Sequence, residues 1–279
     1  MEAAAIVLAG GRSSRMGTSK AALEWHGTTL LHRTTAMLAR TVSGPVVVVR
    51  APGQPLPDLP RDVRVVEDPV EGVGPLQGIA TGLSAVPDAQ LAFVTSTDLP
   101  FLHPRFATRV LAALDDDTDV ALPVARGYRQ PLAAGYRTAL APLIAELLDA
   151  GHHRPPDLFA RCRVRELTDA DLLADAALAD VDPELDSVLN VNSPEDYAAA
   201  RARPAPWVTV ERYGPLLARG GPRSTSVQAA TLGAAAGAAG VELDAYVVAA
   251  LNGDRISRDP WLPLVAGDTI AFVSADAGG

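Results

Sequence analysis

Two adjacent glycines and two basic side chains follow the first apolar run of the chain. Gly10 and Gly11 come after the run Ala3–Leu8, and Arg15 and Lys20 come shortly after the glycines. Glycines let the backbone approach a phosphate closely and direct its N–H groups toward it. Arginine and lysine side chains supply positive charge for a triphosphate. The stretch therefore predicts a phosphate-binding loop, although it matches neither the P-loop pattern nor G-x-G-x-x-G.

Carboxylates follow two other apolar runs. Asp98 comes just after Leu91–Thr95, and Asp68 comes just after Val63–Val66. Mg²⁺ takes few carboxylates from a protein and keeps phosphate oxygens and water as its other ligands. We therefore expect Asp98 to be a magnesium ligand, the alternative being a turn former or helix cap before Pro100. For Asp68 the alternative to a role in binding is an Asp-Pro turn.

The elements that position these groups alternate between strands and helices. Strands are expected at Ala3–Leu8, Pro45–Val49, Val63–Val66, Leu91–Thr95 and Val120–Val124. Helices are expected at Thr29–Arg40 and Thr138–Ala150, and from Ser193-Pro194 to about Arg201. This alternation predicts βαβ units and a Rossmann-like α/β fold, with a mostly parallel sheet covered on both faces. Ligands of such sheets bind at the carboxyl ends of the strands, where the glycines and both aspartates should meet.

The pattern changes after a short proline-bearing linker, Arg203–Pro206. Strands are expected at Val208–Tyr213, Ala245–Leu251, Arg255–Ser257 and Thr269–Ser274, with a helix weakened by two glycines at Val227–Ala239. Asn252-Gly253 is a strong hairpin signal. We expect one domain at residues 1–203 and a small α+β domain at residues 207–279, ending in a free tail from Asp276.

Composition excludes several classes of protein. The net charge is −9 without a visible basic stripe, which argues against a nucleic-acid partner. Apolar runs stay short of the roughly 18 residues that a membrane span requires, and no basic segment precedes Ala3–Leu8 as in a signal peptide. The single cysteine, Cys162, allows neither an internal disulfide nor a cysteine-based zinc site. We expect a cytoplasmic protein.

The segment from Leu8 to Lys20 resembles the signature L-A-G-G-x-S-x-R-M-G-x-x-K of the molybdenum-cofactor guanylyltransferase (MobA) family. Later segments that resemble the same family, in the same order, are Glu67-Asp68 with Gly74–Gly78 (G-P-L-x-G), Thr97–Pro100 (D-x-P), Arg129–Leu132 on the acceptor side, and Asn190–Asp196 (N-x-N-[ST]-P-E-D). The resemblance covers residues 1 to about 200.

The resemblance implies an enzyme that transfers GMP from GTP to Mo-molybdopterin with Mg²⁺ and releases pyrophosphate. It implies catalytic roles for Arg15, Lys20 and Asp98, with the metal on Asp98. It implies nucleotide binding by Leu8, Ala9, Gly10, Gly11, Lys20, Asp68, Asp98, Asn190 and Asn192. Asn192 could equally serve the N-terminus of the last helix. Arg50 stands where such enzymes often have an asparagine near the nucleotide.

Alternatives to guanylyl transfer stay open. The cytidylyltransferase relatives share the first motif, but they usually lack G-P-L-x-G and carry aspartates where this chain has Asn190 and Asn192, which favours guanine. Cytidylyl transfer from CTP to the same acceptor is the nearest alternative, and a sugar-1-phosphate nucleotidyltransferase is another. A nucleotide-binding scaffold without catalysis is a third, against which the intact Lys20 and Asp98 speak.

The C-terminal region resembles the small sulfur-carrier proteins with a ubiquitin-like β-grasp fold, above all the small subunit of molybdopterin synthase (MoaD). The resemblance rests on the element order, Leu251–Asp254, Ala266–Asp268 and the terminal Gly278-Gly279. It implies that the Gly279 carboxylate is adenylated and converted to a thiocarboxylate, with the synthase large subunit and an adenylating enzyme as partners. A thiamine-pathway carrier, or an appendage that carries no sulfur, remains an alternative.

Overall fold

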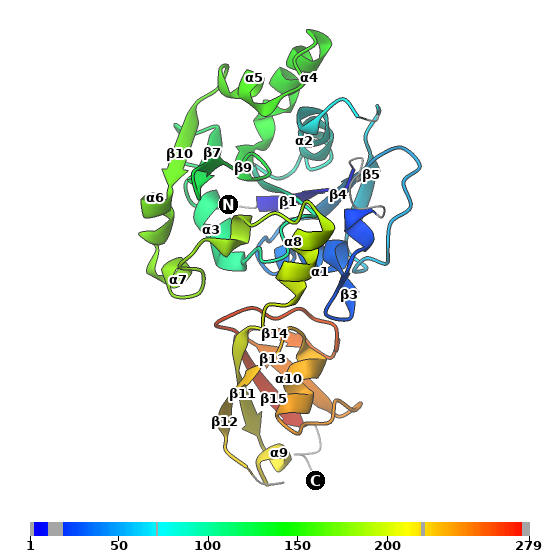
Figure 1. Ribbon diagram of the computed structural model, residues 1–279, viewed down its shortest axis with the longest axis vertical. Coiled ribbons are helices and arrows are strands. Elements are labelled where there is room, and N and C mark those ends of the chain that lie inside the picture. Colours follow the sequence, from blue (N-terminus) through cyan, green and yellow to red (C-terminus); the bar gives the residue numbers. More distant parts are fainter. Residues whose placement is uncertain (1–2, 11–18, 71, 219–220, 275–279) are drawn as a thin grey trace. The chain divides into compact units, whose positions relative to one another are not determined.

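Each of the two units of the chain is built around its own β-sheet (Figure 1). The structure, a computed structural model, describes residues 3–10, 19–70, 72–218 and 221–274. Unit 1 comprises Met1–Trp25 and Thr29–Ala200, and unit 2 comprises His26–Thr28 and Arg201–Gly279.

Unit 1 contains a mostly parallel sheet with the strand order β10-β7-β9-β6-β1-β4-β5, and β8 pairs with β7. Its strands are β1 (Ala3–Leu8), β4 (Val46–Arg50), β5 (Arg64–Glu67), β6 (Leu91–Ser96), β7 (Val120–Ala125), β8 (Tyr128–Arg129), β9 (Ala133–Arg137) and β10 (Val164–Thr168). β1 pairs in parallel with β4 and β6, β4 with β5, and β10 with β7. The predicted α/β fold is confirmed for this unit, and all five of its predicted strands are present.

Helices cover both faces of this sheet (Figure 1). One face packs against α1 (Leu30–Leu38), α3 (Pro104–Leu111), α6 (Asp169–Leu173) and α7 (Ala176–Ala179). The other packs against α2 (Pro75–Ser84), α4 (Ala141–Asp149) and α5 (Pro155–Phe159). Because successive side chains of a strand point to opposite faces, Ala5 and Val7 of β1 join the first core while Ile6 and Leu8 join the second. This explains the continuous apolar run at β1.

The remaining elements of unit 1 are short connections and one further helix. They are the 3₁₀ turns η1 (Lys20–Ala22), η2 (Thr138–Leu140) and η3 (Asp186–Val188), the short strands β2 (Glu24–Trp25) and β3 (Thr28–Thr29, of which Thr28 belongs to unit 2), and α8 (Pro194–Arg201, of which Arg201 belongs to unit 2). Helix α8 begins at Pro194, as the sequence predicted.

Two elements near the centre of unit 1 were not predicted. β9 runs antiparallel between β6 and β7, and its short sequence Ala-Ala-Gly-Tyr-Arg has no clear period. Helix α2 begins at Pro75 and includes Gly78 and Gly82, which lower its intrinsic helix propensity. Tertiary packing compensates, because Leu76, Ile79 and both glycines of α2 are buried.

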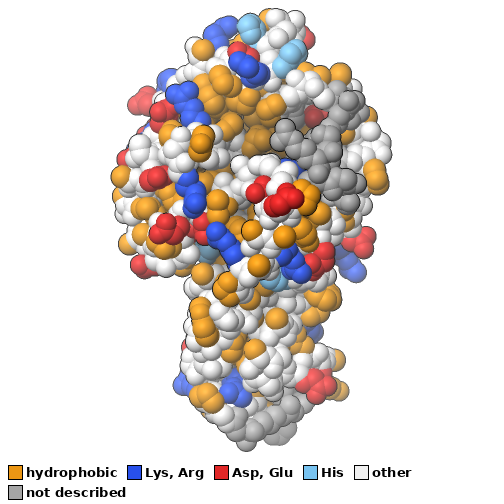
Figure 2. All heavy atoms as spheres, in the orientation of Figure 1, with side chains coloured by type: hydrophobic (Ala, Val, Ile, Leu, Met, Phe, Trp, Pro, Cys, Tyr) orange, Lys and Arg blue, Asp and Glu red, His pale blue; other side chains and the backbone are white. Residues whose placement is uncertain are grey.

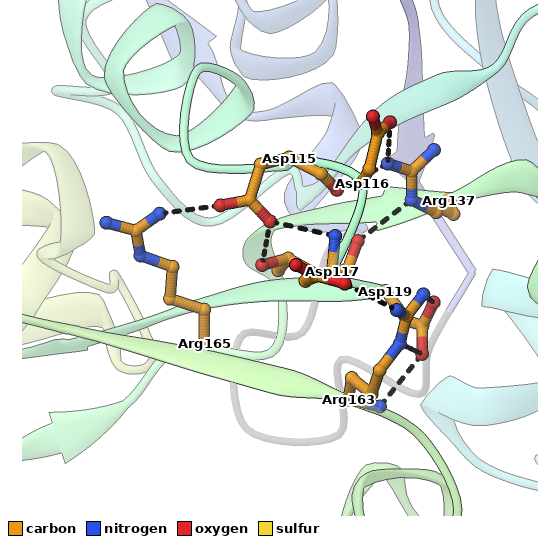
Figure 3. A network of polar contacts seen from close by, with 8 residues as sticks. Asp115, Asp116, Asp117, Asp119, Arg137, Arg163 and Arg165 are labelled. Atoms are coloured by element: carbon orange, nitrogen blue, oxygen red, sulfur yellow. Dashed lines mark hydrogen bonds and ion pairs between the residues drawn. The ribbon is translucent and has the colours of Figure 1, made fainter.

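A network of charged side chains lies where β7 and β10 begin (Figure 3). Both Nε and Nη2 of Arg163 donate to the carboxylate of Asp119, at 3.1 and 2.7 Å. Arg165 lies 3.2 Å from Asp115, in the acidic turn before β7. Hydrogen bonds from Arg163 hold the pKa of Asp119 below its usual range. Ionised Asp119 therefore stabilises the folded state, and this stabilisation is lost as the pH falls through the lowered pKa.

Unit 2 contains a five-stranded sheet with the order β12-β11-β15-β13-β14. Its elements are β11 (Trp207–Tyr213), α9 (Pro215–Ala218), β12 (Ser224–Gln228), α10 (Leu232–Ala238), β13 (Val247–Leu251), β14 (Arg255–Ser257) and β15 (Thr269–Ser274). β11 and β15 are parallel, and the other pairs are antiparallel. Leu232, Ala235 and Ala236 of α10 belong to the core of this unit.

The predicted helix Val227–Ala239 begins too early. Val227 belongs to β12, a strand that was not predicted, and α10 begins only at Leu232. Thr231 is the N-cap, and its side chain accepts a hydrogen bond from the Ala234 N–H at 3.3 Å. The alanine-rich composition obscured this boundary, because it favours a helix more than the preceding Ser-Thr-Ser alternation favours a strand.

The described residues contain no helix that is long and apolar enough to cross a membrane. On the face shown in Figure 2, the acidic and basic side chains of unit 1 are interspersed among apolar ones. This face therefore carries charged side chains of both signs.

We predict that Gly82→Ala destabilises unit 1 by about 1–3 kcal/mol. A Cβ at Gly82 would lie 2.3 Å from Cγ2 of Ile6, because α2 packs closely on β1. Denaturant unfolding of the full chain measures the loss. Gly237→Ala in α10 is the matched control, since its Cβ would meet no heavy atom within 4 Å, and it should stabilise by about 0.4–1 kcal/mol. Equal stability of Gly82→Ala and the wild type would refute the packing argument.

Candidate functional site

A cavity of about 400 Å³ opens at the carboxyl edge of the unit 1 sheet. Its walls come from the ends of β1, β4, β5 and β6 and from the loop that leads into α2. This is the edge at which the sequence placed the site, because ligands of open α/β sheets bind beyond the carboxyl ends of the strands. The volume suits a small molecule.

Six of the predicted site residues line this cavity. They are Leu8, Ala9, Gly10, Lys20, Asp68 and Asp98. Asn192 contacts one of them, Lys20, whereas Asn190 is exposed and is not among the lining residues. Gly11 and Arg15 lie outside the described residues. Leu132, from the segment that resembles the acceptor side, also lines the cavity.

Lys20, Asp98 and Asn192 come together from three distant segments of unit 1. The Nζ atom of Lys20 lies 3.2 Å from Oδ2 of Asp98 and 2.8 Å from Oδ1 of Asn192. The side chains of the ion pair are 21% and 19% exposed, so solvent screens them only in part. The arrangement places one cation between an anionic and a neutral oxygen at the cavity wall.

The N-terminus of α8 does not use the Asn192 side chain. Asp196 instead accepts hydrogen bonds from the N–H groups of Asn192 and Ser193, both at 3.0 Å, and the Asp196 N–H donates to the hydroxyl of Ser193. The bond from the Asn192 N–H is the main cause of the lowered pKa of Asp196. The side chain of Asn192 contacts Lys20 instead, and its role as a nucleotide ligand stays a prediction.

Asp98 is held by its neighbours on both sides. Ser96 donates its hydroxyl to Oδ1 of Asp98, and Val191 donates its N–H to the Asp98 carbonyl at 2.9 Å. Buried Arg33 of α1 donates through Nε to the carbonyl of Pro100 at 3.1 Å. Ser96 lines the cavity and was missed by the sequence analysis. Its position two residues before Asp98, at the end of β6, was the available signal.

Asp68 follows β5 and is half-buried at the cavity. Its Oδ1 atom is buried and has no hydrogen-bond partner. Burial raises the pKa of this carboxyl, and a hydrogen bond from Thr81 offsets part of the effect. Gly78 of α2 lies close by, because a Cβ there would be 3.5 Å from Oδ2 of Asp68. A ligand that donates a hydrogen bond would satisfy the unpaired oxygen.

Arg50 ends β4 beside the cavity without lining it. Its Nη2 lies 2.6 Å from Oε1 of Glu67, and its Nη1 donates to the carbonyl of Gln54 at 3.1 Å. The guanidinium therefore holds the turn that follows β4. Gln54, in that turn, was not singled out by the sequence analysis.

The charged groups of the cavity fit a magnesium ion that arrives with phosphate. The described residues contain no group of three or more His, Cys, Asp or Glu side chains that could hold a metal ion. The cavity does contain the carboxylates of Asp98 and Asp68, the latter with an unpaired buried oxygen. Mg²⁺ in phosphate-transferring enzymes is held by one or two carboxylates together with substrate phosphates, so this donor set is sufficient.

We predict that Asp68→Asn raises the melting temperature of the ligand-free protein at neutral pH. The pKa of Asp68 is raised by burial, so its ionised form destabilises the folded state above the folded pKa, and this penalty vanishes below the unfolded value of 3.8. The advantage of the variant should therefore shrink as the pH falls toward 3.8. Thermal unfolding across a pH series measures it.

The control for this variant is Asp88→Asn, an exposed carboxylate in the turn after α2. It should leave the melting temperature unchanged at every pH. A wild type more stable than Asp68→Asn at neutral pH would contradict the desolvation argument.

Comparisons with known proteins agree with the geometry of unit 1. A family model described as a MobA-like NTP transferase domain matches residues 5–166, which is more than half of the chain. A probable molybdenum cofactor guanylyltransferase of Mycobacterium tuberculosis is 42% identical over 156 residues, which are 54% of this chain and 76% of that protein. One from Bacillus cereus is 30% identical over 200 residues, covering 71% of this chain and 95% of the relative.

A solved structure has the same fold. The molybdopterin-guanine dinucleotide biosynthesis protein A from Archaeoglobus fulgidus superposes with a TM-score of 0.53 at 22% identity. The match covers 71% of this chain and 96% of that structure. At this identity the likeness concerns the fold alone.

Proposed function

The chain is a nucleotidyltransferase that belongs to the MobA-like NTP transferase domain family, and we propose that it transfers GMP from GTP to Mo-molybdopterin. The relatives from Mycobacterium tuberculosis and Bacillus cereus bear the name of a molybdenum cofactor guanylyltransferase. The acceptor in this proposal is the terminal phosphate of Mo-molybdopterin.

The convergence of Lys20, Asp98 and Asn192 at one wall of the cavity carries the proposal. Nucleotidyl transfer requires little covalent chemistry from the protein. It requires in-line positioning and neutralisation of the charge that develops on the phosphates. A lysine held between a carboxylate and an amide oxygen, in a cavity that Gly10 also lines, supplies positive charge for this neutralisation.

In the proposed reaction an oxygen of the acceptor phosphate attacks the α-phosphorus in line. A new P–O bond forms, the bond from the α-phosphorus to the oxygen bridging the β-phosphorus breaks, and pyrophosphate leaves with that electron pair. Lys20 binds phosphate oxygens, whereas the N–H of Gly10 donates to the Val49 carbonyl at 3.2 Å. Gly11 and Arg15, outside the described residues, would complete the loop by their resemblance to the family signature.

Asp98 would hold Mg²⁺ together with the triphosphate, and Asp68 would contact the nucleotide or the acceptor. A bound Mg²⁺ neutralises negative charge on the phosphate oxygens. Ser96 and Val191 keep Asp98 in place, and Lys20 moves its ion pair from the carboxylate to the incoming phosphates. Leu8 and Ala9 would lie along the nucleotide.

Guanine is favoured as the base because Asn190 and Asn192 stand where the cytidylyl-transferring relatives usually carry aspartates. The contact of Lys20 with Asn192 supports a place for Asn192 at the site. Asn190 is retained as a ligand on the resemblance alone. Cytidylyl transfer from CTP to the same acceptor is the second candidate.

We predict that the purified chain, given Mg²⁺ and Mo-molybdopterin, releases pyrophosphate from GTP and not from CTP. Asp98→Asn should lower the rate by on the order of 100-fold or more, because the variant loses the charge that holds Mg²⁺ and orients Lys20. Asp88→Asn is the matched control and should retain the wild-type rate.

Each other result has a defined meaning. Turnover with CTP alone would overturn the weight placed on the two asparagines. An unchanged rate in Asp98→Asn would contradict the metal assignment. No turnover with either nucleotide from folded protein would favour a sugar-phosphate acceptor or a scaffold without catalysis.

For unit 2 we propose a ubiquitin-like β-grasp domain that acts as a MoaD-like sulfur carrier in molybdopterin synthesis. Its support is the parallel pairing of its first and last strands, the packing of α10 on the sheet, and the sequence Gly278-Gly279. The linker 203–206 contains neither helix nor strand, in keeping with the proposed domains 1–203 and 207–279.

The tail lies outside the described residues. In the proposal an adenylating enzyme activates the Gly279 carboxylate, which becomes a thiocarboxylate and donates sulfur within the large subunit of molybdopterin synthase. Glycines suit this role because a tail without side chains can enter a narrow active site.

We predict that an adenylating enzyme of the molybdopterin pathway, with ATP and a sulfur donor, exchanges one oxygen of the chain for one sulfur. Intact-mass spectrometry detects the exchange, and a chain without Gly279 is the control. Absence of the exchange, while an authentic carrier is converted in the same mixture, would identify unit 2 as an appendage that carries no sulfur.

A further inference from the structure

The side chain of Gln54 bridges the ends of two neighbouring parallel strands at the cavity. Its Nε2 donates to the carbonyl of Ala9, just past β1, at 3.0 Å. Its Oε1 accepts from the N–H of Ala51, just past β4, at 3.0 Å. One carboxamide therefore links the two backbone segments at the point where the ladder between β1 and β4 has ended.

The two bridged groups are the partners of the next ladder bond. The N–H groups of Ala5 and Ala9 donate to the carbonyls of Pro45 and Val49, at 3.0 and 2.8 Å. In a parallel pair, the residue that donates at one step accepts at the next from the residue two positions farther along its partner. Continuation of the ladder would therefore join the Ala51 N–H to the Ala9 carbonyl. Gln54 occupies that place.

The Gln54 amide stands in place of a direct backbone hydrogen bond, and it satisfies both backbone groups where the strands separate. A buried N–H or C=O without a partner is costly, so strand ends that part must find other partners. The side-chain amide resembles a peptide group, because it offers one acceptor and one donor across its width. It keeps the ends of β1 and β4 apart by the width of one amide group.

The separated ends belong to the cavity wall. Ala9, Gly10 and Ala51 all line the cavity. A Cβ at Gly10 would lie 3.2 Å from the N atom of Ala51, so the two backbone segments remain close even with the amide between them. The Gln54 amide therefore sets the width of the cavity at this point.

The turn that presents Gln54 is itself fixed. Gly53 adopts a φ of +65°, and the Gln54 N–H donates to the Ala51 carbonyl at 3.1 Å. Arg50 binds the Gln54 carbonyl and also pairs with Glu67 of the neighbouring strand. The amide is therefore held from its own backbone as well as by its two strand contacts.

We propose that Gln54 is a positioning residue that sets the width of the nucleoside end of the cavity and thereby contributes to base selectivity. The inference rests on the proposed function, which places the nucleotide along Leu8, Ala9 and Gly10. Gln54 acts through the backbone of Ala9 and Ala51, and it leaves the phosphate groups to Lys20 and Asp98.

The decisive variant is Gln54→Glu, which keeps the size and the acceptor but loses the donor. Its carboxylate would oppose the carbonyl of Ala9 and displace that strand end. Calorimetric titration of the full chain with Mg²⁺ and GTP, CTP or inorganic triphosphate separates nucleoside binding from phosphate binding. We expect GTP to bind about 10-fold more weakly, triphosphate to bind as to the wild type, and the preference for GTP over CTP to fall.

Gln90→Glu is the matched control, because Gln90 is exposed just before the amino end of β6, away from the cavity. It should bind all three ligands as the wild type does. A structure of Gln54→Ala gives a readout independent of binding. Without the bridge, the Ala51 N–H should donate directly to the Ala9 carbonyl and narrow the cavity.

The remaining outcomes separate this inference from the proposed function. Wild-type affinity for GTP in Gln54→Glu, or an equal loss of GTP and triphosphate, overturns the role of Gln54 while leaving guanylyl transfer intact. A wild-type chain that binds triphosphate but neither nucleotide overturns the proposed function and this inference together. Strands that stay apart in Gln54→Ala overturn the bridging argument.

Discussion

The contact of Lys20 with Asp98 and Asn192 is the interaction around which unit 1 is arranged. Lys20 is separated along the sequence by 78 positions from Asp98 and by 172 positions from Asn192. A partly buried lysine between two oxygens is favourable only if the oxygens are fixed beforehand, since each mobile partner would add an entropic cost. The fold provides this fixation through the end of β6, the hydroxyl of Ser96, and the N–H of Val191 on the Asp98 carbonyl.

The parallel sheet determines where such groups can meet. Parallel strands end at one edge, so β1, β4, β5 and β6 deliver their following residues to one cavity. The cores on the two faces hold these strands rigidly, and the ends beyond the last ladder bonds are free to take other partners. Gln54 shows how a side chain satisfies the backbone at such an end. The site thus combines a fixed scaffold with locally separated strand ends.

The sequence was sufficient for the features that depend on local pattern. The buried strands of unit 1 are recognisable in the sequence as apolar runs, and Asp98 comes just after one of them. It was insufficient where tertiary contacts override propensity, as in β9, in α2 with its two interior glycines, and at the start of α10. Gln54 was missed for a related reason, because only the fold brings the Ala9 carbonyl near its side chain. Ser96 was missed although its partner Asp98 is only two residues away.

The cavity contains one of the buried polar atoms that unit 1 leaves without a hydrogen-bond partner. Among its described residues, the buried side-chain atoms without a hydrogen-bond partner are Nε of Arg50, Oδ1 of Asp68 and Nδ1 of His153. Asp68 lines the cavity, whereas Arg50 and His153 are not among its lining residues. Buried polar atoms without partners are rare in folded proteins and tend to mark functional sites. The unpaired Asp68 oxygen at the cavity therefore indicates a polar interaction that a ligand completes.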